Sequence, residues 1–205
     1  MFSVKKAYFT KKRRTVIIYF TGFRDKGVIQ MRKNHIFLIG FMGSGKSTVA
    51  KYLSRTYKMC QIEMDAQIEK KEGRSISSIF EKEGEEYFRT LETDFLKNLP
   101  FRKAFVVSCG GGVAVKEENV REMKTKGKIV LLTAEPETIY NRVKRSHTRP
   151  LLEGNMNVFY IKELMEKRRE LYEKAADFSV KTDGKTAAEI GEEIMQRIRE
   201  EEEKA

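Results

Sequence analysis

Cysteine and histidine are scarce in this 205-residue chain, which holds two of each. Cys60 and Cys109 lie far apart, so they form neither a disulfide framework nor the paired spacing of a zinc site. His35 and His147 are isolated in the same way. We therefore expect no disulfides and no zinc centre that the sequence alone would reveal, which fits a protein of the reducing cytoplasm.

Long hydrophobic runs are also missing. None approaches the roughly 18 residues that a membrane-spanning helix needs. The apolar run from Val16 to Phe20 is too short for a signal peptide that is followed by its cleavage site. We therefore expect no membrane span. The length suits one domain with a substantial core, plus tails.

Acidic residues are nearly absent from the first thirty positions. This segment holds eight Lys or Arg and one acid, Asp25, so it carries +7 of the chain's net charge of +11. Residues 31–205 carry only +4, which a basic cleft for an anionic substrate explains without nucleic acid. We expect residues 1–30 to be a poorly ordered, non-essential extension, Met31 to be a natural start, and residues 31–205 to form one domain. The alternatives are a basic arm that touches nucleic acid or membrane, and a transit peptide.

Short apolar runs alternate with helical patterns along residues 31–205. This alternation indicates an α/β fold, in which helices cover both faces of a parallel sheet and ligands gather at the carboxyl ends of the strands. The expected strands are 35–40, 61–65, 104–108, 128–132 and 178–180. The expected helices are 46–57, 66–71, 75–81, 85–99, 116–126, 135–145, 157–175 and 187–199, before a solvated acidic tail at 200–203.

The segment from Gly40 to Ser47, GFMGSGKS, matches the phosphate-binding pattern G-x-x-x-x-G-K-[ST] between a predicted strand and a predicted helix. Glycines let the backbone approach a ligand, and successive N–H groups at a helix start hold phosphate oxygens. We expect Lys46 to reach the β- and γ-phosphates of a nucleotide and the Ser47 hydroxyl to bind Mg²⁺. The predicted nucleotide-binding residues are Gly43, Ser44, Gly45, Lys46, Ser47 and Thr48.

Acids and glycines follow the next two predicted strands. Asp65 stands near the expected γ-phosphate, where a carboxylate can accept a hydroxyl proton, and Glu63 can hold a water ligand of Mg²⁺. Helix capping by Asp65 and solvent exposure of Glu63 are the alternatives. Gly110, Gly111 and Gly112 follow a buried strand, which suits a ligand that lies against the main chain, or else a bare turn.

Two arginines are placed to bind a carboxylate. Arg89 and Glu92 are three residues apart on one predicted helix, so they can pair, and the pair either fixes the guanidinium for a ligand or is a surface ion pair. Arg168 falls on the apolar stripe of its helix, whereas Arg169 should face solvent. An arginine on a buried face needs an acidic partner or an anionic ligand, unless only its stem packs there.

Three further arginines lie near the expected nucleotide. Arg149 belongs to a polar loop, about residues 146–156, and is either a lid arginine that swings onto the transferred phosphate or a solvated side chain. Arg142 and Arg145 are one helical turn apart, and they either flank the adenine or coat their helix.

Taken together, these motifs resemble the shikimate kinase family. The matching stretches are GFMGSGKST (40–48), EMDAQIE (63–69), YFRTLE (87–92), CGGG (109–112), RPLL (149–152) and RRELY (168–172), in order over about residues 34–182. The resemblance implies a P-loop NTPase fold of the nucleoside-monophosphate-kinase-like class, with a five-stranded parallel sheet. It also implies Mg²⁺-dependent transfer of the ATP γ-phosphate to the 3-hydroxyl of shikimate, a step toward chorismate and the aromatic amino acids.

The resemblance assigns roles to individual residues. Asp65 would serve as the catalytic base beside Lys46, Arg149 would reach ATP phosphate as a third catalytic group, and Arg142 would lie by the adenine. The implied shikimate-binding residues are Asp65, Phe80, Phe88, Arg89, Glu92, Gly110, Gly111, Gly112 and Arg168, with the two arginines on the carboxylate. The implied metal-binding residues are Ser47 and Glu63, although Glu63 replaces the first aspartate of the family's usual Asp-x-Asp. A monomer in the cytoplasm is expected.

Other nucleotide-binding classes fit less well. A gluconate kinase of similar fold is the nearest rival, but it would not explain two carboxylate-binding arginines beside three glycines. The G-x-P-G-x-G-K-G-T loop of adenylate kinase is not matched, and the N-K-x-D motif of guanine-binding switches is missing. A nucleic-acid-binding function would depend on residues 1–30 alone.

Overall fold

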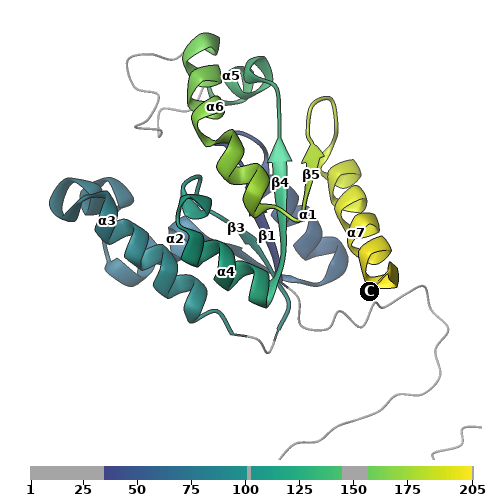
Figure 1. Ribbon diagram of the computed structural model, residues 1–205, viewed down its shortest axis with the longest axis horizontal. Coiled ribbons are helices and arrows are strands. Elements are labelled where there is room, and N and C mark those ends of the chain that lie inside the picture. Colours follow the sequence, from purple (N-terminus) through teal and green to yellow (C-terminus); the bar gives the residue numbers. More distant parts are fainter. Residues whose placement is uncertain (1–34, 101–102, 145–156, 205) are drawn as a thin grey trace, which may run out of the picture. The chain divides into compact units, whose positions relative to one another are not determined.

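A computed structural model describes residues 35–100, 103–144 and 157–204. Five parallel strands form one sheet in the order β2-β3-β1-β4-β5 (Figure 1). The strands are β1 (His35–Ile39), β2 (Cys60–Glu63), β3 (Phe105–Ser108), β4 (Gly127–Thr133) and β5 (Phe178–Lys181). The predicted α/β class and the five-stranded parallel sheet are therefore confirmed. The extension 1–30 and the loop 146–156 lie outside the described residues.

The central strand β1 is buried along its whole length. It pairs with β3 on one side and with β4 on the other, so that Leu38 is in register with both Ser108 and Val130. A parallel sheet with helices on both faces needs such continuously apolar strands, because neither face meets water.

Helices occupy the connections between the strands. Their bounds are α1 (Lys46–Tyr57), α2 (Met64–Glu72), α3 (Ile76–Lys97), α4 (Glu117–Lys126), α5 (Pro136–Val143), α6 (Val158–Ala175) and α7 (Ala187–Lys204), with a short 3₁₀ turn, η1 (Val113–Val115). Side chains of α2, α3, α4 and α6 share a core cluster with Phe37 and Ile39 of β1. Helices α1 and α7 pack against each other, and α1 also contacts β1, β2 and β3.

Local sequence explains several helix ends. Ser75 caps α3 by accepting a hydrogen bond from the Ser78 N–H at 3.2 Å, and Asn157 caps α6 through the Tyr160 N–H at 2.9 Å. Gly84 interrupts α3 with φ 80° and ψ 176°. This break falls where two separate helices, 75–81 and 85–99, were expected.

Two predicted boundaries were wrong. The strand expected at 61–65 ends at Glu63, and α2 begins at Met64, because Met64 and Ile68 are one helical turn apart and both pack in the core. Asp65 therefore lies in the first turn of a helix. The acidic run Glu200 to Glu203 was expected to be a solvated tail, but it continues α7 to Lys204, and Glu201 pairs with Lys128 of β4 at 2.5 Å.

The strand order places the functional segments at one edge of the sheet. The loop after β1, the start of α2 after β2 and the glycines after β3 all leave the carboxyl ends of neighbouring strands. Ligands of open α/β sheets bind at this edge. None of the helices within residues 35–100, 103–144 and 157–204 is long and apolar enough to cross a membrane.

Candidate active site

The phosphate-binding loop has a backbone that only glycine adopts easily. Gly40, Gly43 and Gly45 have φ values of 135°, 77° and 100°. A Cβ atom on Gly43 would lie 2.7 Å from the Val143 side chain of α5. Gly45 is the N-cap of α1, so the free N–H groups of the first helical turn face the loop. This arrangement favours an anion.

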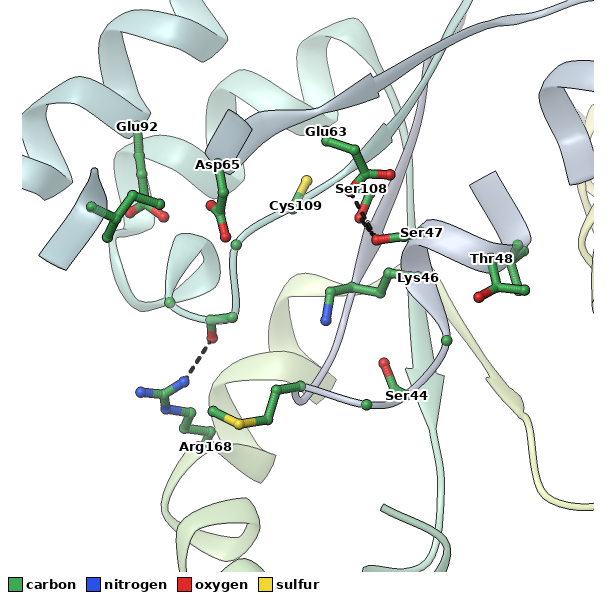
Figure 2. Close-up of a pocket in the computed structure, with 18 of the residues that line it drawn as sticks. Ser44, Lys46, Ser47, Thr48, Glu63, Asp65, Glu92, Ser108, Cys109 and Arg168 are labelled. Atoms are coloured by element: carbon green, nitrogen blue, oxygen red, sulfur yellow. Dashed lines mark hydrogen bonds between the residues drawn. The ribbon is translucent and has the colours of Figure 1, made fainter. Parts of the chain in front are cut away.

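Lys46 and Ser44 place polar atoms inside this loop. The Lys46 ammonium donates hydrogen bonds to the carbonyls of Gly40 at 2.8 Å and Phe41 at 3.0 Å. Figure 2 shows the ammonium in the open space between the loop and Asp65. The Ser44 hydroxyl is buried and has no hydrogen-bond partner within the described part of the chain, which suits a ligand oxygen. Thr48, the next residue of α1 after Ser47, is exposed.

Three oxygen-bearing side chains meet beside the loop. The Ser47 hydroxyl of α1 donates to Glu63 Oε2 of β2 at 2.9 Å and lies 3.3 Å from the Ser108 hydroxyl of β3 (Figure 2). The strand register causes this meeting, since Glu63 and Ser108 are paired residues. Hard oxygen atoms of this kind suit Mg²⁺. Ser108 was not predicted from the sequence, because it meets Ser47 only through the register of strands that are distant in sequence.

Asp65 lies against the glycine turn, which is formed by Gly110, Gly111 and Gly112. A Cβ atom added to Gly110 would lie only 2.7 Å from the Asp65 carboxylate oxygen Oδ1. The protein around Asp65 screens its carboxyl from water and raises its pKa, while the positive charge of Lys46 opposes the rise. The result is a carboxylate that binds a proton more readily than an ordinary aspartate.

Arg89 and Glu92 form the predicted ion pair on α3. Arg89 Nη1 donates to Glu92 Oε2 at 2.8 Å, and Glu85 accepts from the same guanidinium at 2.5 Å. Glu92 is fully buried. Burial raises the pKa of its carboxyl, and the neighbouring Arg89 guanidinium opposes the rise. A Cβ atom on Gly112 would collide with the Arg89 guanidinium, so a larger residue at this position would displace the guanidinium.

Arg168 reaches the glycine turn from α6. Its Nη1 donates to the carbonyl oxygen of Gly111 at 3.1 Å (Figure 2), and the Tyr172 hydroxyl donates to the same oxygen. Arg169 points away and pairs with Glu166 and Glu173 on the helix surface. The predicted difference between the two arginines is therefore confirmed. The described hydrogen-bond partners of Arg168, the Gly111 carbonyl and the Tyr172 side chain, are neutral, so its charge is available to an anion.

A single cavity of about 1100 Å³ joins these groups. The rings of Phe80 and Phe88 lie 5.0 Å apart between centroids and supply an apolar wall. The cavity runs from the phosphate-binding loop to the glycine turn, and it is lined by the predicted residues Gly43, Ser44, Gly45, Lys46, Ser47, Thr48, Glu63, Asp65, Phe80, Phe88, Arg89, Glu92, Gly110, Gly111, Gly112, Arg142 and Arg168.

Arg142 joins α5 to the phosphate-binding loop and to Thr182, the residue after β5. Its guanidinium donates to the carbonyl oxygen of Gly43 at 3.2 Å, to the Thr182 hydroxyl at 3.0 Å and to the Thr182 carbonyl at 2.9 Å. Thr182, at the end of β5, is a second residue that sequence reasoning missed. Arg149 and Arg145 lie outside the described residues.

Comparisons with known proteins agree with this geometry. The family model described as shikimate kinase matches residues 42–199. The shikimate kinase of Persephonella marina is 44% identical over 165 residues, which cover 80% of this chain and 99% of that protein. The structure of shikimate kinase from Acinetobacter baumannii in complex with shikimate aligns with a TM-score of 0.76 at 35% identity, covering 82% and 94% of the two chains.

The Aquifex aeolicus shikimate kinase structure is a third relative. It is 41% identical, has a TM-score of 0.68, and the match covers 80% of this chain and 96% of that one. The fold, the motifs and these matches agree that the chain belongs to the shikimate kinase family.

Proposed function

We propose that this chain transfers the γ-phosphate of ATP to the 3-hydroxyl of shikimate, giving shikimate 3-phosphate and ADP. The observation that supports this most directly is the single cavity, which has a phosphate-binding loop at one end and two arginines beside a glycine turn at the other. A phosphate donor and a small carboxylic acid can therefore occupy one cavity side by side. Phosphoryl transfer depends mainly on such positioning and on neutralisation of charge.

The nucleotide occupies the end formed by Gly43 to Thr48. The backbone N–H groups and the Ser44 hydroxyl bind phosphate oxygens, and Lys46 exchanges its loop carbonyls for the β- and γ-phosphates. Arg142 lies beside the nucleotide, since it contacts Gly43 from outside the loop. The family resemblance assigns Arg149, which lies outside the described residues, to the transferred phosphate.

Ser47 and Glu63 would hold Mg²⁺, Ser47 directly and Glu63 through water. Their oxygen atoms lie 2.9 Å apart beside the loop, so both side chains are near the same point. The metal would supply positive charge beside the phosphate groups. Glutamate in place of the family's usual aspartate fits this role because its longer side chain already reaches Ser47.

Shikimate occupies the other end of the cavity. Arg89 and Arg168 bind its carboxylate, and Glu92 holds the Arg89 guanidinium in place. Gly110, Gly111 and Gly112 leave room for the ring, which also packs against Phe80 and Phe88. The buried Glu92 Oε1, which has no hydrogen-bond partner among the described residues, gives a second carboxylate oxygen near Gly110.

Asp65 accepts the proton of the attacking hydroxyl. The hydroxyl oxygen bonds to the γ-phosphorus, the bond from that phosphorus to the β,γ-bridging oxygen breaks, and ADP leaves. The proton moves from the hydroxyl to the Asp65 carboxylate, whose raised pKa favours its acceptance. Lys46 stabilises the charge that develops on the phosphate oxygens.

We also propose that the enzyme is a cytoplasmic monomer, on the strength of the family resemblance.

ADP release by the full-length protein tests this proposal. We expect release from Mg-ATP to require shikimate, and gluconate, the acceptor of the nearest rival, to give no release. ADP release that is the same with and without shikimate, from protein that still binds ATP, would overturn the assignment of the acceptor.

A further inference from the structure

A buried polar pair joins α3 to α4 behind the shikimate end of the cavity. Thr93 of α3 is 3% exposed and Asn119 of α4 is fully buried. Neither side chain is among the described residues that line the cavity. Buried polar side chains are costly unless they are hydrogen-bonded, so a pair such as this needs a structural or functional reason.

The Thr93 hydroxyl has two acceptors within hydrogen-bond distance. They are Asn119 Oδ1 at 2.7 Å and the Arg89 carbonyl oxygen, one turn back on α3, at 2.9 Å. Asn119 Nδ2 donates to the Val113 carbonyl at 3.1 Å. The opposite orientation of the amide would place two acceptor oxygens together at Val113, so only this one satisfies the site. Lys116 also donates to the Thr93 hydroxyl at 3.1 Å.

Both ends of this chain of hydrogen bonds touch elements of the site. Thr93 is one turn after Arg89, and it adjoins Glu92 in sequence. Val113 directly follows Gly112, and its N–H donates to the carbonyl of Gly110 at 3.2 Å. The pair therefore connects the helix that carries the arginine to the turn that carries the glycines.

The fit between those two elements is tight. The Arg89 guanidinium occupies the space that a Cβ atom on Gly112 would need. A change in the separation of α3 from the glycine turn would therefore move the guanidinium relative to the turn and to Arg168. Small displacements of positioning groups have large effects on binding and rate.

We propose that Thr93 and Asn119 are positioning residues for the carboxylate of the acceptor: they fix α3 against the glycine turn so that Arg89 stays aligned. The inference rests on the proposed function, because the carboxylate is that of shikimate. It concerns only the acceptor end of the cavity, since both bonds lie away from the phosphate-binding loop.

Steady-state kinetics of Thr93→Val test the inference in the full-length enzyme. Valine keeps the shape of threonine and removes only the hydroxyl. We expect the KM for shikimate to rise about tenfold, with the KM for ATP unchanged. Thr93→Ser, which keeps the hydroxyl, should restore the wild-type KM for shikimate. Thr90→Val is the matched control, because Thr90 is exposed on the same helix and its hydroxyl bonds only to the carbonyl of Tyr87 at 2.6 Å.

Calorimetric titration with shikimate gives a readout that does not depend on turnover. Asn119→Ala should weaken binding of shikimate to the same extent as Thr93→Val, and the double variant should be no weaker, because both changes break one connection. A lower melting temperature with unchanged KM values, or equal losses for ATP and shikimate, would overturn the inference. Failure of the proposed function would differ, because the wild-type enzyme itself would then show no shikimate-dependent turnover.

Discussion

Lys46 places a positive charge inside the phosphate-binding loop, where its ammonium already bonds to two loop carbonyls. Methionine has a similar length but no charge, so Lys46→Met should reduce kcat by about three orders of magnitude. Shikimate binding, measured by calorimetry, should stay near the wild-type value because Lys46 lies at the other end of the cavity. Turnover within a few-fold of wild type would rule out this site for phosphoryl transfer.

Arg168 and Arg169 are neighbours in sequence that have different environments. Arg168 lines the cavity, whereas Arg169 pairs with glutamates on the exposed side of α6. Arg168→Ala should raise the KM for shikimate by at least about tenfold, since a charge-assisted hydrogen bond is lost. The KM for ATP should not change, and Arg169→Ala should leave both constants as they are. Equal loss of affinity for both substrates would indicate a structural role for Arg168.

Replacement of the Asp65 carboxylate should raise stability and lower activity. Because the folded chain raises the pKa of this carboxyl, it holds the proton more tightly than the unfolded chain does, and the ionised form lowers stability above the ordinary pKa. Asp65→Asn should therefore melt at a higher temperature than wild type at pH 7, while its kcat falls by about two orders of magnitude or more.

The pH dependence of kcat/KM provides the matching control for Asp65. Wild-type activity should decline as the pH falls through the raised pKa, and the residual activity of Asp65→Asn should lack that decline. A variant that melts below wild type and keeps the same acid limb would contradict the role of Asp65 as the base.

Strand β1 begins with a buried histidine that gives the fold its own pH dependence. His35 accepts a hydrogen bond from the Phe105 N–H at its Nδ1, 3.3 Å away. Burial lowers the pKa of His35, and the positive charge of Lys126 lowers it further. Protonation is then easier in the unfolded chain, so stability should fall as the pH drops below the ordinary value of 6.5.

Melting curves between pH 7.5 and pH 5 measure this effect. Asparagine keeps an acceptor near the Nδ1 position but does not titrate, so His35→Asn should show a weaker loss of melting temperature on acidification than wild type does. Identical pH profiles for the two proteins would show that other groups control acid stability.

Elements whose ends depend on local sequence were predicted well. The bounds of α1 were predicted correctly, because its start is set by the phosphate-binding motif, and the caps of α3 and α6 follow from Ser75 and Asn157. The start of α2 was missed because the apolar residues Ile62 and Met64 are two positions apart, which is the spacing of a strand. Met64 is helical because it packs in the core together with Ile68, one helical turn later. The end of α7 was missed because the helix continues through the acidic run, where Glu201 pairs with Lys128, far away in sequence.

In the site, too, features set by local sequence were predicted, whereas contacts between distant segments were not. The Arg89–Glu92 pair follows from helical spacing, and the loop residues follow from their motif. Ser108 and Thr182 could not be recognised in this way, because Ser47 and Arg142 meet them only through the register of strands that are distant in sequence. The functional roles of all the predicted site residues remain predictions.

At the scale of the whole molecule, the catalytic groups that the structure describes all belong to one compact unit, Met31–Ala205. Removal of residues 1–30 should therefore change kcat and both KM values by less than about twofold. The melting temperature should also stay the same. A collapse of activity or of the thermal transition in the truncated protein would show that the extension is part of the working enzyme.

The central feature of the proposed mechanism is one cavity that holds ATP and shikimate in line for direct transfer of the γ-phosphate. The most direct measurement is phosphorus NMR of the full-length protein's reaction with Mg-ATP and shikimate. We predict one new phosphomonoester signal, coupled to the proton on the ring carbon that carries the 3-hydroxyl, which grows in proportion to ADP. Inorganic phosphate as the only product, or a phosphomonoester at another hydroxyl, would contradict the placement of shikimate by Arg89, Arg168 and Asp65.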